Sequence, residues 1–233
     1  MRWVAGADGY KSRWCVVLHD LDTDEFRARI VPTFAGLLGL AERPGIVAVD
    51  IPIGLPAFTA PGGRACEREA RRILGRRASS VFSAVGRGAL AGASRAEADG
   101  LSRAAGGLGI GAQAWGLAEK LKEADAVMSP ERQRLVHEVH PEVSFWAMNG
   151  CAAMPAGKKS PEGERDRVEA LVTAGLPRGF VEALPAGLRV GRDDFLDACA
   201  AVWTAGRIAA GVAGRLPAHE DRDARGLDQA IWY

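Results

Sequence analysis

Acidic residues on apolar strands are the first sign of chemistry in this sequence. Asp8 ends the apolar run of residues 3–8, and Asp50 lies within the apolar run of residues 46–51. A carboxylate in such surroundings is costly unless it is paired or bound to a cation. If the two strands are parallel neighbours, both acids lie at the sheet edge where open α/β sheets bind ligands. Each acid could instead cap the loop that follows it, but their joint placement favours a site for a divalent metal.

A third group of acids opens the last long apolar segment. Asp193, Asp194 and Asp197 begin residues 193–211, which are apolar on almost every side and predict a buried helix. Favourable charge at a helix N-terminus accounts for Asp193 and Asp194. It accounts less well for Asp197, which lies one turn deeper. Asp194 and Asp197 are three residues apart and can share a helix face, so we expect at least one of them to join Asp8 and Asp50.

The segment His137-Glu138-Val139-His140-Pro141-Glu142 adds further candidates. It does not match the H-E-x-x-H pattern, which excludes a zinc protease of that type. On a strand, Glu138 and His140 point to the same side, so Glu138 could be one more acid at the cluster. For the two histidines, a hydrogen-bonded structural role is favoured over metal ligation.

Arginines gather at helical spacing in residues 64–77, where six Arg and two Glu occur. Such a stripe, with Arg64, Arg68 and Arg71 on it, could track phosphates, or it could be an ordinary solvated face. Ser79 and Ser80 follow at a turn and could cap the next element or contact a phosphate. The glycine-rich residues 106–111 have no strand before them and no Gly-Lys-Ser/Thr after them, so a P-loop is not supported.

Composition restricts the class of protein. The chain has 233 residues, 48% of them hydrophobic, which fits one domain with a sizeable core. Its 30 basic and 29 acidic residues give no overall field toward a polyanion. The four cysteines are scattered, which excludes a thiolate zinc site and a disulfide framework. No signal peptide or membrane span is evident, so we expect a cytoplasmic protein without membrane contact.

The order of elements predicts an α/β fold. Apolar patterning indicates strands at residues 3–8, 14–18 and 26–30, a helix at 33–41 and a strand at 46–51. Helices and glycine-rich links follow, with segments at residues 64–74, 89–105 and 112–128. Strand character returns at 133–140, and helices are predicted at 141–148, 162–174 and 193–211. No repeat is visible, so residues 1–233 are read as one domain with a helical insertion at about residues 57–130.

Several short motifs give the chain a resemblance to a known family over nearly its whole length. They are residues 50–56, residues 79–82, Gly109-Ile110 with Gln113-Ala114-Trp115 and Lys120, residues 138–142, residues 158–163 and residues 193–198. Their order and spacing resemble the family called domain of unknown function 429, described as predicted RNase H-like nucleases. The resemblance implies an RNase H-like mixed five-stranded sheet flanked by helices, with the helical insertion between strands four and five.

The resemblance also implies a site. It suggests catalytic roles for Asp8, Asp50, Asp194 and Asp197, and Glu138 joins them as the further acid expected from its strand position. Of these, Asp8, Asp50, Asp194 and Asp197 would bind Mg²⁺ or Mn²⁺, whose preferred ligands are oxygens. The residues expected to contact substrate are Arg64, Arg68, Arg71, Ser79, Ser80, Gln113, Lys120, His140 and Lys158.

Three functions compete at this point. The first is a metal-dependent nuclease or other phosphodiester hydrolase, whose partner is nucleic acid or another phosphorylated ligand. The second is a non-catalytic binding or regulatory protein on the same fold. The third is an actin-like phosphotransferase, which would need two related domains, and the absence of a repeat argues against it. The oligomeric state is left open by the sequence.

Overall fold

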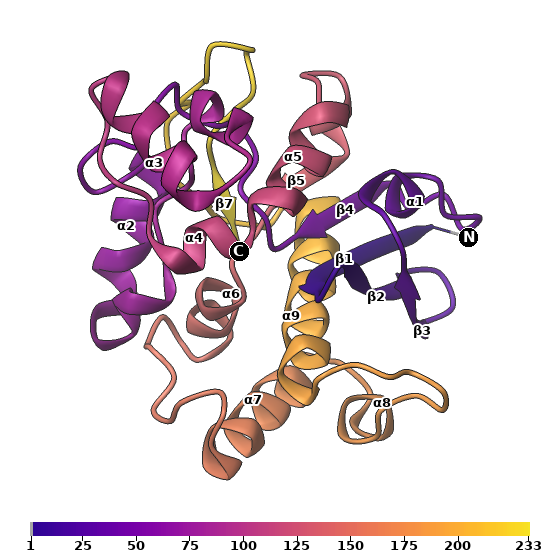
Figure 1. The fold of residues 1–233 in the computed structure, drawn as a ribbon. Helices are drawn as coiled ribbons and strands as arrows, with labels where there is room; N and C mark the ends of the chain where they lie inside the picture. The colour runs from indigo at the N-terminus through magenta and orange to yellow at the C-terminus, as the bar shows by residue number, and fades with distance from the viewer. Residues whose placement is uncertain (1) are drawn as a thin grey trace.

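A five-stranded mixed sheet forms the centre of the protein, whose computed structural model describes residues 2–233. The strands lie in the order β3-β2-β1-β4-β5 (Figure 1). Strand β2 runs antiparallel to both β1 and β3, whereas β4 is parallel to β1 and β5 is parallel to β4. Their bounds are Trp3–Tyr10 for β1, Arg13–Asp20 for β2, Glu25–Val31 for β3, Ile46–Val49 for β4 and Val136–Glu138 for β5. This topology confirms the predicted α/β class and is consistent with an RNase H-like fold.

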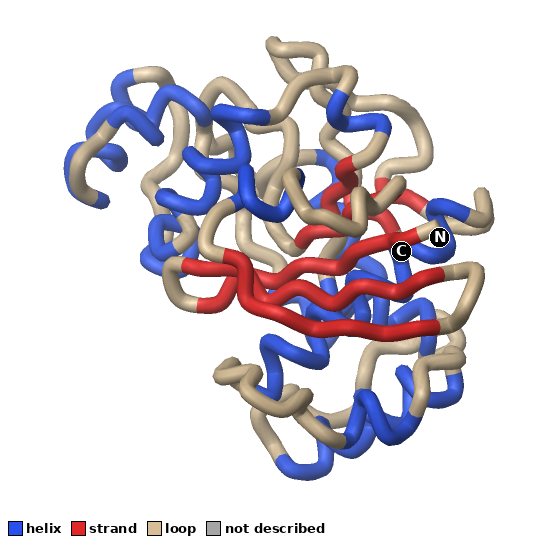
Figure 2. The backbone as a smooth tube through the Cα atoms, turned by 90° about the vertical axis from the view of Figure 1, so that its right-hand side faces the viewer, coloured by secondary structure: helices blue, strands red, loops and turns tan. Residues whose placement is uncertain are grey.

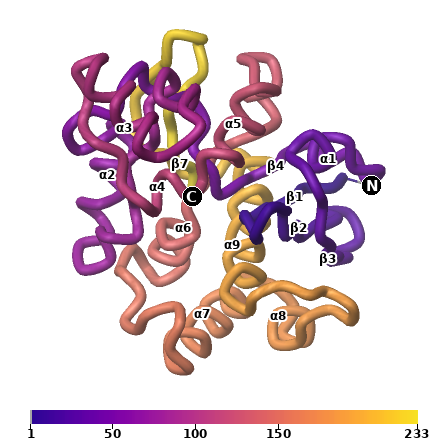
Figure 3. The backbone as a smooth tube through the Cα atoms, in the orientation of Figure 1, coloured from indigo at the N-terminus to yellow at the C-terminus, as the bar shows by residue number. Residues whose placement is uncertain are grey.

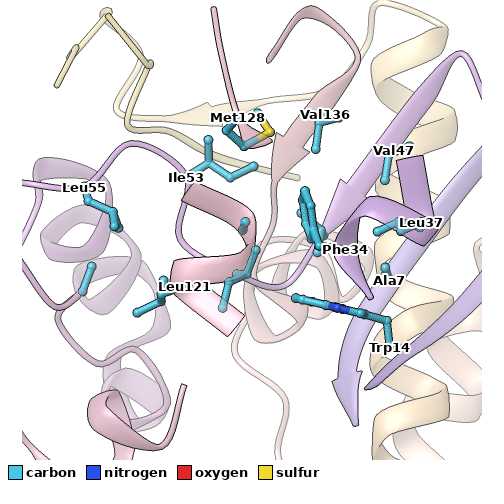
Figure 4. Packing of buried hydrophobic residues seen from close by; sticks show 14 of the residues in the cluster. Ala7, Trp14, Phe34, Leu37, Val47, Ile53, Leu55, Leu121, Met128 and Val136 are labelled. Carbon is cyan, nitrogen blue, oxygen red and sulfur yellow. The ribbon is translucent and has the colours of Figure 1, made fainter. Parts of the chain in front are cut away.

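Helices cover both faces of the sheet (Figure 2). On one face, α1 (Phe34–Leu38) and α5 (Ala118–Val127) pack over alternate residues of β1, β2 and β4. Figure 4 shows this core, in which the Trp14 and Phe34 rings meet edge to face with centroids 5.4 Å apart. On the other face lie α6 (Pro141–Met148), α7 (Pro161–Thr173), α8 (Arg178–Glu182) and α9 (Arg192–Ala209). Alternate strand residues therefore face two different hydrophobic cores, as a sheet covered on both sides requires.

The helix α9 lies unusually close to β1. A Cβ atom added to Gly6 would lie 2.0 Å from the backbone nitrogen of Val202 and 2.5 Å from the carbonyl oxygen of Ala198. Only glycine therefore fits at this crossing, and the α9 residues Ala198, Ala201 and Ala205 are small and buried. The close approach brings the N-terminal half of α9 beside the end of β1 that carries Asp8.

The predicted helical region separates β4 from β5. Its α-helices are α2 (Ala65–Leu74), α3 (Arg95–Ala104), α4 (Ala112–Gly116) and α5, and its 3-10 helices are η1 (Gly75–Ser80), η2 (Arg87–Ala91) and η3 (Arg132–Arg134). The predicted helix at residues 112–128 is thus two helices, and the one at 89–105 is a 3-10 turn followed by α3. The helices α2, α3 and α4 lie on the opposite side of the molecule from β3, whereas α5 packs on the sheet beside α1 (Figures 1 and 3). Near the C-terminus, β6 (Arg215–Leu216) pairs with β7 (Ile231–Trp232). Within the described residues, no helix is long and apolar enough to cross a membrane.

Candidate active site

The carboxyl ends of β1, β4 and β5 open onto one cavity of about 360 Å³. Three aspartates from separate parts of the chain line it: Asp8 on β1, Asp50 directly after β4, and Asp197 on α9. The backbone nitrogen of Asp50 donates to the carbonyl oxygen of Ala7 at 2.9 Å, which extends the β1–β4 pairing to the cavity. The parallel pairing of the two strands and the close approach of α9 at Gly6 account for this convergence.

Asp8 and Asp50 form a carboxyl pair. Their carboxylates interact at the ends of adjacent parallel strands, where like charges disfavour full ionisation of both. Burial raises the pKa of Asp8 well above its usual range, and the negative charges of Asp50 and Asp197 raise it further. Burial also raises the pKa of Asp50, although His140 and Lys158 oppose this effect. The pair is therefore a site of unbalanced negative charge.

Asp197 is buried, with 3% of the residue exposed, and is bound by a lysine. The Lys158 ammonium donates to Oδ2 of Asp197 at 2.7 Å. Burial raises the pKa of Asp197 to about 6, against the lowering effect of Lys158. Burial alone would lower the pKa of Lys158, but attraction to Asp197, Asp8 and Asp50 outweighs it and raises that pKa. Lys158 is thus the positive charge in closest contact with these acids.

Two residues that follow β5 complete the wall of the cavity. His140 Nε2 lies 3.3 Å from the carbonyl oxygen of Ser80, and its buried Nδ1 has no partner among residues 2–233. Glu142 is paired through Oε1 with Arg167, and its buried Oε2 likewise lacks a partner within the described chain. Glu142 was absent from the predicted site. Its position four residues after Glu138, just beyond a strand parallel to β4, was the signal that could have found it.

Glu138 departs from its predicted place. Its carboxylate lies off the cavity lining and accepts two hydrogen bonds from the Arg64 guanidinium, at 2.6 and 2.8 Å. It also accepts one from the backbone nitrogen of Ile53 at 2.7 Å. Both side chains of the pair are almost fully buried. The predictions of a catalytic Glu138 and of a substrate-binding Arg64 are therefore corrected: the two residues form an internal ion pair.

The arginine stripe of α2 does not face the cavity as a whole. Arg68 donates to the carbonyl oxygen of Gly63, and Arg71 donates to that of Val81 at 2.7 Å, so both fasten neighbouring loops. The part of this segment that lines the cavity is the next turn, η1, with its two arginines and two serines. We call these four residues the basic rim: Arg76, Arg77, Ser79 and Ser80. The two serines are among the predicted substrate contacts, whereas the two arginines are not.

The remaining predicted contacts are dispersed. Gln113 lines a second cavity of about 460 Å³, and Phe82 lines both cavities. Lys120 is buried, with 8% of the residue exposed. Its ammonium donates to the carbonyl oxygen of Arg13 at 2.6 Å and lies 4.3 Å from the Trp14 ring centroid. Lys120 is absent from the cavity lining, but its ammonium interacts with the Asp8 charge and its side chain lies against Gly9 at the cavity wall. Its role as a substrate ligand stays a prediction.

The chemistry of the acids fits a hard divalent cation, since oxygen ligands suit Mg²⁺ and Mn²⁺. Asp194 lies outside the cavity lining, near Gly191, where an added Cβ would lie 2.5 Å from Asp194 Oδ2. Within residues 2–233, no group of three or more His, Cys, Asp or Glu side chains is arranged as a metal site. Asp8 and Asp50, whose unfavourable mutual charge a cation would relieve, are the residues best suited to hold one.

Comparison with known proteins assigns the chain to a family without a described activity. The model of the family described as "Protein of unknown function (DUF429)" matches residues 6–222. No curated protein and no solved structure matches the chain.

Proposed function

The chain belongs to the DUF429 family, and we propose that it is a metal-dependent nuclease or other phosphodiester hydrolase. The observation that carries the proposal is the meeting of Asp8, Asp50 and Asp197 in one cavity at the carboxyl edge of the sheet. Buried carboxylates with raised pKa values are concentrated at functional sites, and here three of them share a cavity.

The cavity lining contains acidic and basic groups that suit the two parts of a phosphodiester reaction. Asp8 and Asp50 would hold a Mg²⁺ or Mn²⁺ ion, which when bound can activate water and stabilise charge on the leaving oxygen. The basic rim lines the same cavity and supplies guanidinium and hydroxyl donors for phosphate oxygens. Among the described residues, Arg76 makes no ion pair or hydrogen bond within the chain, so its guanidinium is available to a ligand.

A non-catalytic binding protein on the same fold is the second candidate. The observation that favours it is the Lys158–Asp197 ion pair, which already satisfies one of the three acids without a metal. Such a protein would use the basic rim to bind a phosphorylated ligand and would leave the ligand intact.

Cleavage assays separate the two functions. Purified protein is incubated with single-stranded, duplex and branched nucleic acids in the presence of Mg²⁺ or Mn²⁺. We expect wild-type protein to cleave at least one of them, and Asp50→Asn to reduce cleavage to background because the substitution removes charge that would hold the cation.

The matched control is Asp24→Asn, the same chemical change at an exposed turn between β2 and β3. Asp24 has a left-handed backbone conformation that Asn also tolerates, so this variant should cleave like wild type. If wild-type protein cleaves none of the substrates with either metal, the binding function replaces the hydrolase.

A further inference from the structure

The Lys158 ammonium reaches the acidic cluster from the loop between α6 and α7. It lies 2.7 Å from Oδ2 of Asp197 and lines the same cavity as Asp8 and Asp50. One oxygen of Asp197 is therefore engaged by a fixed positive charge of the protein itself. In a site that held two divalent ions between shared carboxylates, that oxygen would be expected to face a metal instead.

Hydrogen bonds from Arg167 and Ser160 hold the loop that carries Lys158. Arg167 donates to the carbonyl oxygen of Ala156 at 3.2 Å, and the Ser160 hydroxyl donates to that of Gly157 at 2.9 Å. A Cβ atom on Gly163 would lie 2.0 Å from the Gly157 carbonyl oxygen, so the loop backbone touches the first turn of α7. These contacts hold the base of the Lys158 side chain in place beside α9.

The charges of the cavity favour one divalent ion. When ionised, Asp8, Asp50 and Asp197 carry three negative charges, and Lys158, which contacts Asp197, compensates for one of them. The guanidinium groups of Arg76 and Arg77 line the same cavity and add positive charge, which further disfavours a second divalent ion. Glu142, the other acid on the lining, has its own partner in Arg167. One divalent ion balances the two charges that remain, whereas a second would have to expel the ammonium or leave excess positive charge in a buried site.

We infer that Lys158 is a permanent cation of this site and takes the place of a second metal, so that the protein binds one divalent ion per chain. The inference rests on the proposed function and specifies how its site is charged. Asp8 and Asp50 hold the ion, Asp197 positions Lys158, and the ammonium provides a second positive charge for a phosphate oxygen of the substrate.

Counting bound Mn²⁺ tests the inference without any measurement of cleavage. The full-length protein is titrated with Mn²⁺. The number of bound ions is determined by calorimetry and by the decrease of the electron paramagnetic resonance signal of free Mn²⁺. We expect one ion for wild-type protein and one for Asp197→Asn, because Asp8 and Asp50 are intact. We expect a second, weaker ion for Lys158→Met, because the Asp197 carboxylate becomes available to a metal.

Two variants control for unrelated effects. Lys159→Met removes the charge of the adjacent exposed lysine, which is absent from the cavity lining, and should bind one ion as wild type does. Lys158→Arg retains the charge and should also bind one ion. Should Lys158→Met fail to fold, Asp197→Asn still decides the question, since loss of Mn²⁺ binding in that variant would make Asp197 a metal ligand.

Other results would overturn the inference. Two ions on the wild-type protein, or a single ion of unchanged affinity on Lys158→Met, would show that Lys158 does not replace a metal, and both leave the hydrolase proposal intact. Wild-type protein that binds no Mn²⁺ would remove the inference together with the metal-dependent function.

Discussion

Gly6 on β1 and Val202 on α9 meet so closely that a Cβ on Gly6 would lie 2.0 Å from the Val202 backbone nitrogen. Two residues further along β1 is Asp8, and just over one turn before Val202 on α9 is Asp197. The distance between strand and helix at this crossing therefore also sets the distance between two acids of the candidate site.

Replacing Gly6 with Ala should destabilise the protein, because backbone atoms cannot move aside as a flexible side chain can. Overpacking of this kind typically costs about 1–3 kcal/mol, and the contact here is with main chain, so we expect at least the upper end of that range. Urea denaturation measures the change. The control is Gly100→Ala in α3, where no atom lies within 4 Å and the better helix propensity of Ala should add about 0.5–1 kcal/mol. A Gly6→Ala variant as stable as wild type would contradict the packing argument.

Asp50→Asn should stabilise the metal-free protein while it removes activity. Burial raises the pKa of Asp50, so its ionised form is unfavourable in the folded state at neutral pH. Neutral Asn relieves the repulsion with Asp8, and we expect a gain of about 1 kcal/mol, or roughly 2–4 °C in melting temperature for a chain of this size. Thermal melting in a chelator, with Asp24→Asn alongside, measures it. A less stable Asp50→Asn variant would indicate a purely structural role for this acid.

The pH dependence of stability should carry the signature of Asp197. Because burial raises the pKa of Asp197 to about 6 from a usual value of 3.8, the folded state binds its proton more tightly than the unfolded state does. The free energy of unfolding should therefore lose a contribution from this group as pH rises from about 4 through 6. The Asp197→Asn variant has no titrating group at this position, so its free energy of unfolding does not decrease for this reason. The difference in free energy of unfolding, variant minus wild type, should therefore increase between pH 4.5 and pH 7. Urea titrations of both proteins at the two pH values test this, and a pH-independent difference would contradict it.

The buried pair of Arg64 and Glu138 should behave as a structural element. Arg64→Met leaves the Glu138 carboxylate buried without its partner, and such a loss typically costs about 3–5 kcal/mol. The double variant Arg64→Met with Glu138→Leu removes both charges of this pair and should recover part of the stability. Recovery stays incomplete because the buried Glu67 carboxylate, which accepts from Arg64 Nε at 2.6 Å, also loses its cation. Urea denaturation of the single and double variants measures this coupling. If Arg64→Met were as stable as wild type, the ion pair would not hold α2 against β5 as the structure indicates.

The basic rim should govern the salt dependence of nucleic-acid binding. Replacing both Arg76 and Arg77 with Ala removes two candidate phosphate contacts, so the slope of log affinity against log salt should flatten by roughly 1.4–1.8. Fluorescence anisotropy with a labelled oligonucleotide over a range of salt concentrations gives the slope. Arg68→Ala is the matched control, because Arg68 is bonded to the carbonyl oxygen of Gly63 away from the cavity, and its slope should equal that of wild type. Equal slopes for all three proteins would exclude the rim as the phosphate contact.

The order of elements and two of the acids could be predicted from local patterns. Apolar runs and turns depend on neighbouring residues, so the three antiparallel strands, the strand before Asp50 and the buried C-terminal helix are visible in the sequence. The placement of Asp8 and Asp50 follows from the same patterns, because parallel strands end at a common edge of a sheet.

What only the tertiary structure decided is which charged residues meet. Glu138 is separated from Arg64 by 74 residues, and Lys158 from Asp197 by 39, so no local pattern relates these partners. The direction of a side chain on the three-residue strand β5 depends on its register with β4, and a shift of one residue would turn Glu138 to the opposite face. A buried charge takes the nearest opposite charge or polar group in space, and that neighbour is set by the packing of α2, α9 and the loop that carries Lys158.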